Sequence, residues 1–263
     1  MGKGTQSVKH VKKSTPEPEE LKSYRTTSPT NAWEQFRNDS RASFESLRAI
    51  LRRDQGDLCA YCEMHLNENN QQVAHFHPKS DTAGSRNWAL EWGNLWLACK
   101  GGSQSWMSSE EHYLPPLPDN ISCDERKGNR IVDGLVIAPD EIPLFPRIFR
   151  YEQHPDGMEM RPEESACEEI GLQPEKVQCT IDAFNLNCRR LAKARLRVHR
   201  RLEQAIMKLR ESDYEDPEKG FRLLAQRHLS KDEDGCWPAF FTLLRWRFKT
   251  AAEDYLRSCD YKG

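Results

Sequence analysis

Four cysteines between residues 59 and 123 have the types and the spacing of metal ligands. Cys59 and Cys62 are separated by two residues, a gap that lets two thiolates reach one ion from a single turn. Cys99 and Cys123 follow further along the chain, and a tetrahedral Zn²⁺ takes four such ligands. These residues predict a structural zinc knuckle. The alternative is that all four are small buried apolar side chains.

A histidine, an asparagine and an aspartate lie among these cysteines and offer the groups that phosphodiester hydrolysis needs. That reaction requires a base near the attacking oxygen and a divalent cation on the scissile phosphate and the leaving oxygen. Near pH 7 a neutral imidazole such as that of His75 can act as the base. The Asn94 amide can hold a histidine through a ring nitrogen or a backbone carbonyl, and Asp124 is a hard oxygen ligand suited to Mg²⁺. For any single histidine, surface exposure or packing is the alternative.

Short elements in the same region must bring these side chains together. Apolar residues recur near helical spacing from about 31 to 53, and they predict one amphipathic helix or two short ones, ended by Gly56. Residues 72–76 predict a strand that ends at Pro78, because proline cannot donate to a ladder. Residues 123–128 predict a helix or a sharp turn that begins with a cysteine and an aspartate. A histidine and an asparagine bracketed by a cysteine quartet indicate a catalytic site.

An insertion lies inside the cysteine motif. Residues 100–122 separate Cys99 from Cys123 by many more than the usual two residues. The insertion is rich in Gly, Ser and Pro and carries Trp106 and an acidic pair. We expect it to influence the choice of substrate, because it should lie beside the expected site.

Composition divides the chain into three predicted parts with an α+β fold. Residues 1–28 contain almost no large apolar side chains, which predicts a flexible tail. We expect residues 29–135 to form the domain that holds the motifs, with a leading helix. Residues 136–263 should form a connecting segment, with a hairpin turn at 154–157, followed by a helical C-terminal region.

Helical patterns in that last region are clear. An apolar stripe predicts a helix from about 180 to 211. Asp216 and Pro217 supply a cap and a first-turn proline for a helix to about 229, and Trp237 begins another. The segment 213–257 has more aromatic residues than one helical seam needs. These aromatics indicate either a subunit interface or an ordinary helical core.

The composition of the whole chain indicates a soluble protein. Charged residues make up 30% of the 263 residues, and the mean hydropathy is −0.85. No apolar run approaches the roughly 20 residues of a membrane helix, and the start lacks a signal-peptide core, so we expect a cytoplasmic protein with no membrane partner. In a reducing compartment the nine cysteines do not indicate a disulfide framework. Five of them lack the paired spacing and are expected to pack in the interior: Cys167, Cys179, Cys188, Cys236 and Cys259.

Positive charge is concentrated locally, although the net charge is −2. Residues 189–201 contain seven arginines and lysines and no acidic residue. These side chains could follow a phosphate backbone, or pair with the Glu-rich stretch before them or with a partner protein. The residues that we expect to contact nucleic acid are Lys79, Lys127, Arg189, Arg190 and Arg197.

The order of these motifs resembles that of HNH nucleases with a zinc-knuckle ββα-metal (treble-clef) core. The chain is most similar to the PtuB family, the HNH component of Septu and retron anti-phage systems. The resemblance covers roughly residues 30 to 210. It rests on Cys59-Ala-Tyr-Cys62-Glu63, on His75-Phe-His-Pro-Lys-Ser80, on Trp92-Gly-Asn-Leu95 and on Thr180-Ile-Asp-Ala-Phe-Asn-Leu-Asn187 with the Arg-rich segment after it.

The resemblance implies a role for each motif residue. His75 would be the general base, Asn94 the central asparagine, and Asp124 the last HNH position and a ligand of a catalytic Mg²⁺ or Mn²⁺. It implies a metal-dependent endonuclease that cleaves DNA or RNA and acts with a PtuA-type ATPase. In retron systems the partners would include a reverse transcriptase and its msDNA. The alternative is a zinc-knuckle subunit that binds nucleic acid or a partner without cleaving.

One position departs from the family pattern. HNH proteins usually carry Asp, Glu or His just before the catalytic histidine, whereas this chain has Ala74. His77 would lie on the same side of a strand as His75 and is expected to replace the missing ligand of the catalytic metal. The other interpretations are that substrate phosphates complete the metal shell, or that the nuclease is degenerate.

Overall fold

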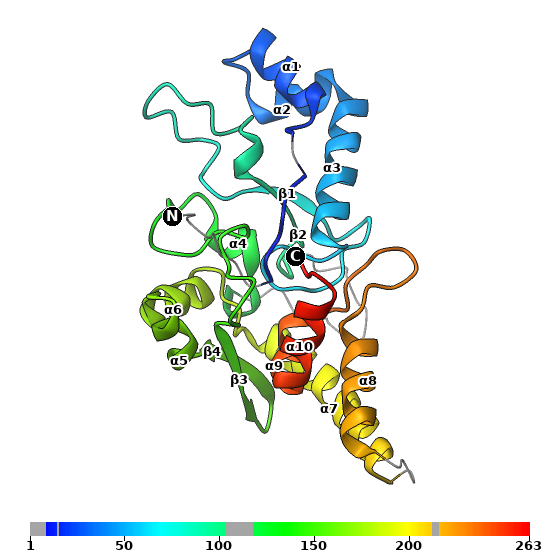
Figure 1. The fold of residues 1–263 in the computed structure, drawn as a ribbon. Coiled ribbons are helices and arrows are strands. Elements are labelled where there is room, and N and C mark those ends of the chain that lie inside the picture. Colours follow the sequence, from blue (N-terminus) through cyan, green and yellow to red (C-terminus); the bar gives the residue numbers. More distant parts are fainter. Residues whose placement is uncertain (1–8, 15, 104–117, 212–215) are drawn as a thin grey trace.

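The computed structural model describes residues 9–14, 16–103, 118–211 and 216–263. Within these ranges it is a mixed α/β protein of helices and two small antiparallel sheets (Figure 1). The first half contains α1 (Glu19–Thr27), α2 (Trp33–Asp39), α3 (Arg41–Gln55), β1 (Gln72–His75), η1 (Trp92–Asn94), β2 (Leu95–Ala98), η2 (Pro118–Asn120) and α4 (Cys123–Lys127). The second half contains β3 (Phe149–His154), β4 (Gly157–Pro162), α5 (Glu164–Glu169), α6 (Pro174–Ala183), α7 (Arg189–Glu211), α8 (Pro217–Leu229), α9 (Phe241–Phe248) and α10 (Thr250–Ser258).

The strands β1 and β2 form an antiparallel pair at the centre of the first half. Gln72 lies opposite Ala98 and His75 opposite Leu95, so the strand ends that carry His75 and lead to Asn94 lie together. All four residues of β2 are buried, because α3 packs on this strand and contributes Leu47 and Leu51 to the core. The strand expected at 72–76 is confirmed, with its end one residue earlier.

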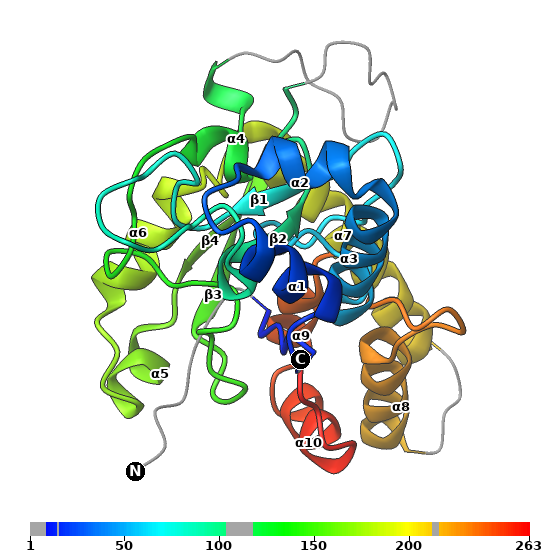
Figure 2. The same cartoon turned by 90° about the horizontal axis from the view of Figure 1, so that it is seen from above.

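The leading helical segment forms two helices, which is the second of the two alternatives that the sequence predicted. α2 and α3 meet at Ser40 and cover the β1–β2 pair, as Figure 2 shows from above. α3 ends at Gly56, whose φ of 62° is left-handed and favours glycine. A Cβ atom there would also come 2.3 Å from the Trp237 ring, so the turn has no room for a side chain.

The second half is mainly helical, with one hairpin. β3 and β4 pair around the turn expected at 154–157, and α7 packs against β4. α8 begins as expected, with the Asp216 side chain accepting a hydrogen bond from the Lys219 N–H and with Pro217 in the first turn. α8, α9 and α10 pack together and on the end of α7.

Two helix boundaries in this half differ from the sequence prediction. The expected helix over 180–211 is two helices, because Asn185 has a left-handed φ of 48° between α6 and α7. The helix expected from Trp237 begins only at Phe241 and is divided at Lys249, which has a φ of 50°. Neither break occurs at a glycine or a proline. Asn185 carries a weak signal, because asparagine adopts a left-handed φ more readily than most residues, and Lys249 carries none.

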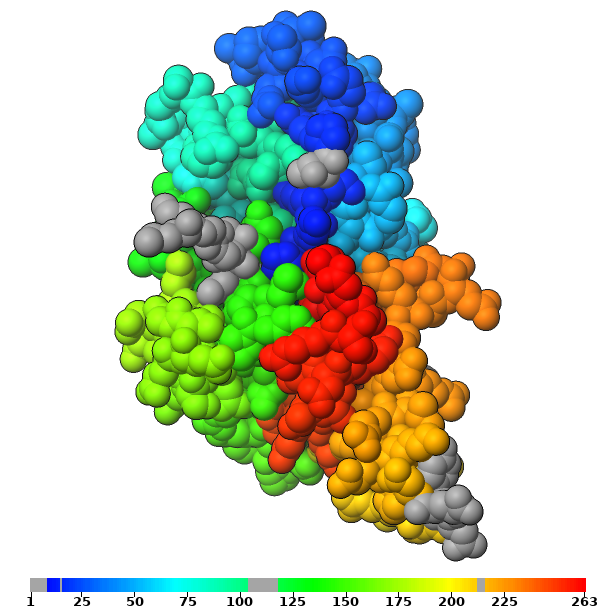
Figure 3. All heavy atoms as spheres, in the orientation of Figure 1, coloured from blue at the N-terminus to red at the C-terminus, as the bar shows by residue number. Residues whose placement is uncertain are grey.

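The described part of the N-terminal region is ordered, which differs from the flexible tail expected for residues 1–28. α1 buries Leu21 completely, and the Val11 N–H donates to the carbonyl of Pro139. Lys13 lies with its ammonium 3.8 Å from the centre of the Trp96 ring. Figure 3 shows this first segment, in dark blue, running across the first half to the red C-terminal residues. Few apolar residues suffice here because the segment enters a groove lined by the rest of the chain.

Three sequence predictions concern the tail, the insertion and the division of the chain. Residues 1–8 of the expected tail and residues 104–117 of the insertion, with Trp106, lie outside the described residues. The division of the chain at residue 135 remains a prediction. Among the helices that are described, none has the length and apolar character needed to cross a bilayer.

Candidate metal centre and candidate active site

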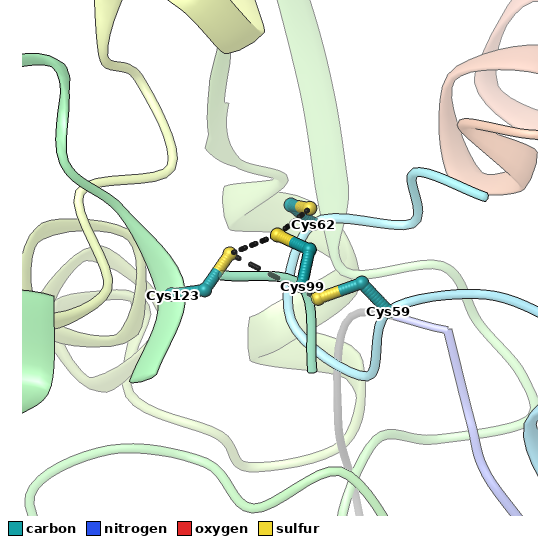
Figure 4. Close-up of side chains that lie close together, drawn as sticks. All are labelled: Cys59, Cys62, Cys99 and Cys123. Carbon is teal, nitrogen blue, oxygen red and sulfur yellow. Dashed lines mark hydrogen bonds between the residues drawn. The ribbon is translucent and has the colours of Figure 1, made fainter. Parts of the chain in front are cut away.

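The four cysteines of the motif come together in a buried cluster. Cys59 and Cys62 lie on the turn after α3, Cys99 directly follows β2, and Cys123 is the first residue of α4 (Figure 4). A hydrogen bond from the Ala60 N–H to the Leu97 carbonyl connects this turn to β2. All four sulfur atoms lie within 4.8 Å of one another. Four side chains that are far apart in sequence therefore share one centre.

The cluster has the dimensions of a tetrahedral metal site. Three of the sulfur–sulfur distances are 3.9 Å for Cys59 to Cys123, 3.7 Å for Cys62 to Cys99 and 3.7 Å for Cys99 to Cys123. A tetrahedron with Zn–S bonds of about 2.3 Å has edges of about 3.8 Å. A disulfide would need about 2.05 Å. The four cysteines can thus hold a metal ion such as zinc.

Arg190 lies beside this cluster, not on the surface. Its guanidinium is buried, and it donates to the Ser122 hydroxyl at 2.6 Å and lies 3.2 Å from the Met64 sulfur. Burial opposes its charge, but the neighbouring Cys99 and Cys62 groups raise the pKa of Arg190. The predicted contact of Arg190 with nucleic acid is therefore wrong for this conformation. Arg190 instead supplies a buried positive charge next to four potential thiolates.

A pocket of about 240 Å³ opens between β1 and α4, next to the cysteine cluster. It brings together two of the three residues expected in catalysis, His75 and Asp124. Two of the lysines expected to contact nucleic acid, Lys79 and Lys127, also line it. The sequence prediction thus placed these four residues in one region, and the structure brings them to one pocket.

His75 is held as a neutral imidazole. Burial lowers the pKa of His75 to about 4. Its Nε2 lies 3.1 Å from the Ala89 carbonyl oxygen, which can only accept a hydrogen bond, so Nε2 carries the proton. The ring also packs edge-on against Trp33 of α2, with 4.9 Å between the ring centres. These contacts leave Nδ1 as the unprotonated, basic nitrogen at neutral pH.

Asn94 fixes the backbone around the histidines. Its side-chain oxygen accepts from the His77 N–H at 2.7 Å, and its amide donates to the carbonyls of His77 and Trp88 at 2.9 and 2.8 Å. The sequence left open whether the partner of the Asn94 amide would be a ring nitrogen or a backbone carbonyl. In the structure its partners are backbone groups. Asn94 therefore positions the chain that follows β1, and it does not line the pocket.

His77 does not join His75 and Asp124. β1 ends at His75, so the alternation of a strand does not continue to His77. The His77 Nδ1 lies 2.8 Å from Asp133 and its Nε2 2.8 Å from Asp81, while its ring stacks on Trp88. Both ring nitrogens are thus engaged away from the pocket. In this conformation the expected role of His77 as a ligand of a metal ion in the pocket is contradicted.

Asp124 has one ionic partner and one oxygen without a hydrogen bond. Its Oδ1 is buried without a hydrogen bond to any described residue, and it forms an ion pair with the Lys127 ammonium 3.5 Å away. Burial raises the pKa of Asp124 to about 6. Lys127 is itself buried and donates to the Gly128 carbonyl at 2.8 Å. A carboxylate oxygen at a pocket wall, held only by a long ion pair, fits a cation ligand.

Other expected residues are dispersed. Arg189 is exposed at the start of α7, and Arg197 is half-buried further along the helix. Arg195 is fully buried and donates to the Leu186 carbonyl at 2.5 Å, so the basic stretch is partly structural. Sequence reasoning missed Glu34 of α2, which pairs with Lys79 at the pocket mouth. Its only sequence signal was its place in the amphipathic helix before the motif.

Together, the cysteine cluster and the polar pocket define a protein with a candidate metal centre beside a candidate hydrolytic site. No family model matches the sequence. The chain is 32% identical over 212 residues to the Escherichia coli protein named "Retron Ec83 putative HNH endonuclease". The matched region covers 73% of this chain and 79% of that relative. The chain belongs to the family of retron HNH endonucleases, which supports a nuclease role.

Proposed function

We propose that the chain is a metal-dependent HNH endonuclease that hydrolyses phosphodiester bonds of DNA or RNA. The observation that carries the proposal is the shared pocket of His75, a neutral imidazole, and Asp124, a carboxylate with one buried oxygen that accepts no hydrogen bond from a described residue. A general base and a cation ligand are the two groups that this reaction needs. The relationship to the retron protein supports the same class of reaction.

His75 would act through Nδ1. Since Nε2–H is held by the Ala89 carbonyl, Nδ1 is the atom that can take a proton from the attacking water. The Trp33 ring and the backbone fixed by Asn94 keep the imidazole in one orientation. Lys79 and Lys127 place positive charge at the same pocket, where they would bind and orient the phosphate.

Asp124 would hold the catalytic Mg²⁺ or Mn²⁺ through Oδ1, in place of its ion pair with Lys127. When bound, such a cation stabilises the negative charge that develops on the scissile phosphate. Ala74 is completely buried and offers no ligand, so Asp124 is the one family metal position that this chain keeps in the pocket. We infer that substrate phosphates complete the metal shell. The ββα-metal core would then comprise β1, β2 and α4.

Zinc is proposed as the ion of the cysteine cluster. Four buried sulfur ligands at tetrahedral spacing suit Zn²⁺, and a closed set of four ligands is typical of a structural site. α4 begins with Cys123 and continues with Asp124, so the ion would hold the helix that presents the catalytic ligand.

The proposed setting is an anti-phage defence complex in the cytoplasm with a PtuA-type ATPase. The similarity to a retron protein supports this setting. A retron reverse transcriptase with its msDNA is the further partner that the setting implies. In such a complex the ATPase would control when the nuclease acts.

Incubation with nucleic acids tests the proposal. The purified chain, alone and with its ATPase, is mixed with plasmid DNA, single-stranded DNA or total RNA, in Mg²⁺, Mn²⁺ or EDTA. We expect cleavage that requires the divalent ion and that His75→Ala lowers by about 10²- to 10⁴-fold, the usual contribution of a general base. His154→Ala is the matched control, because His154 is exposed on the distant β3–β4 turn. Binding without cleavage in every condition would favour the non-cleaving subunit.

A further inference from the structure

A second hollow continues the pocket of His75 and Asp124 along the first helices. It has a volume of about 540 Å³ and lies between α2, α3 and β1. The two hollows share Gln72, Val73 and Lys79, so they form one continuous depression. Trp33, which packs on the His75 ring, lies in the wall of the second hollow. We call this second hollow the α2–α3 groove.

The α2–α3 groove is positively charged. Five cationic residues line it against two acidic ones, although the net charge of the whole chain is −2. The cationic residues are Arg37, Arg41, Arg48, Lys79 and Lys100. Both acids are paired: Glu34 with Lys79, and Glu45 with Arg48 at 2.6 Å.

Two arginines in the groove are available for a ligand. Arg37 and Arg41 are exposed, and within the described residues neither makes a hydrogen bond or an ion pair. They lie on either side of the junction between α2 and α3. Their charge is therefore not neutralised by the described part of the protein, and an anion in the groove would meet it directly.

One face of α3 forms the length of the groove. Arg41, Phe44 and Arg48 follow one another at three and four residues, which places them on the same side of the helix. Arg41 and Arg48 are about 10 Å apart along the helix axis, a span of about three nucleotide steps in one strand. The Arg48 guanidinium lies over the Phe44 ring at 5.7 Å. The groove thus presents cations repeatedly along a line that leads to the pocket.

We propose that the α2–α3 groove binds the phosphodiester backbone of the substrate on one side of the scissile bond. This inference rests on the proposed nuclease function and adds to it the track along which the strand enters. Polyanion backbones are held by arginines and lysines through contacts that do not depend on sequence. Lys79, at the junction of the two hollows, would exchange its pairing with Glu34 for a phosphate of the entering strand.

The salt dependence of binding tests the groove. Full-length protein without added Mg²⁺ or Mn²⁺, which prevents cleavage and spares the cysteine-bound ion, is titrated into short fluorescently labelled duplex DNA, single-stranded DNA and single-stranded RNA over a range of salt concentrations. We expect the double variant Arg37→Ala/Arg41→Ala to bind at least one of these probes about tenfold more weakly. Its slope of log affinity against log salt should be lower by about 1.4 to 1.8, because two phosphate contacts are lost. The three probes show which backbone the groove accepts.

A matched double variant on another helix controls for the loss of charge. Arg222→Ala/Arg227→Ala removes two exposed arginines from α8, far along the chain from the groove. It should keep the wild-type slope. If both double variants lower the slope equally, the loss of any two positive charges explains the effect, and the groove proposal is overturned.

The groove and the nuclease function can fail separately. Wild-type cleavage with an unchanged salt slope in Arg37→Ala/Arg41→Ala would reject the groove while leaving the nuclease intact. Binding that depends on both arginines, without cleavage under any metal, would support the groove and reject the nuclease. Circular dichroism of each variant confirms that it is folded before its binding is compared.

Discussion

At the scale of single residues, burial decides the state of His75. The imidazole lies against Trp33 and the Ala89 carbonyl, and this burial lowers its pKa to about 4, against an ordinary value of 6.5. Above the folded pKa the ring is neutral, so the base is ready at neutral pH without any change of its own charge. A proton can bind the unfolded chain more readily than the folded one between pH 4 and 6.5. Acid in that window therefore disfavours the folded state.

An NMR titration of the histidine ring resonances checks this state. The His75 signal, identified by its loss in His75→Gln, should show no change around pH 6.5, because its folded pKa lies at about 4. A His75 signal that shifts with a midpoint near 6.5 would mean that the ring is solvated and that the proposed base is charged under mildly acidic conditions.

Arg189 and Arg190 are neighbours in sequence with opposite environments. Arg190 is buried beside the cysteine cluster and holds the Ser122 hydroxyl, whereas Arg189 is exposed. We expect Arg190→Ala to lower the free energy of unfolding by about 3 kcal/mol, because it removes one partner of a buried charged network. Arg189→Ala should change it by less than about 0.5 kcal/mol. Urea denaturation measures both, and equal effects would contradict the buried role of Arg190.

Residue types and spacing were enough to predict the cysteine cluster and to place His75 and Asp124 at one site. They were not enough to predict where the side chains of His77 and Arg190 lie. The partners of His77, Asp81 and Asp133, are 4 and 56 residues away, and a strand that stops at His75 removes the alternation on which the prediction relied. Arg190 lies in a run of basic residues, and a run does not reveal which member turns inward.

At the scale of elements, α4 joins the two sites. Cys123 and Asp124 are its first two residues, and the Cys123 N–H donates to the Phe184 carbonyl at 2.8 Å. The cysteine cluster and the pocket are therefore parts of one scaffold, and the loss of the metal should displace the carboxylate. A five-residue helix is too short to be stable alone.

Removal of one ligand tests this dependence. Wild-type protein should contain about one zinc per chain, and Cys123→Ser should lose it and unfold more easily, because metal binding contributes folding free energy. Cys179→Ser is the control, since Cys179 is exposed on α6 and lies outside the cluster. Metal analysis and thermal unfolding give both results. Wild-type protein that contains no metal and is nevertheless stably folded would refute the zinc site.

Elements with local signals were predictable, and elements that depend on distant contacts were not. The cap at Asp216, the hairpin turn at 154–157 and the end of α3 at Gly56 each carry a sequence signature. The break at Lys249 carries none, and at Asn185 the only local signal is that asparagine adopts a left-handed φ more readily than most residues. Both breaks lie beside helices that pack on distant elements, α7 on β4 and α10 on α8.

At the scale of the whole molecule, the C-terminal aromatics form a core. Trp237, Phe241 and Phe248 are buried with Leu202 and Ile206 of α7. Of the two interpretations of residues 213–257, the ordinary helical core thus accounts for these side chains. A subunit interface at residues 213–257 stays a prediction for the side chains that remain accessible, such as the half-buried Trp246.

Deletion of residues 216–263 should therefore damage the fold and not only an interface. It would expose Leu202 and Ile206, which are buried in the full chain. We expect the truncated chain to lose its cooperative thermal transition, followed by circular dichroism. A truncated chain that melts cooperatively at the wild-type temperature would contradict this shared core.

The central claim is that His75 and Asp124 divide the work of one nuclease pocket between base and metal ligand. Single-turnover cleavage measured against Mg²⁺ concentration tests it most directly. We expect His75→Ala to lower the maximal rate by about 10²-fold or more with an unchanged Mg²⁺ midpoint, and Asp124→Ala to raise that midpoint as well as slow cleavage. His77→Ala should keep the wild-type midpoint, because both of its ring nitrogens are engaged by Asp81 and Asp133. Cleavage by His75→Ala at the wild-type rate, or a raised midpoint in His77→Ala with none in Asp124→Ala, would contradict the claim.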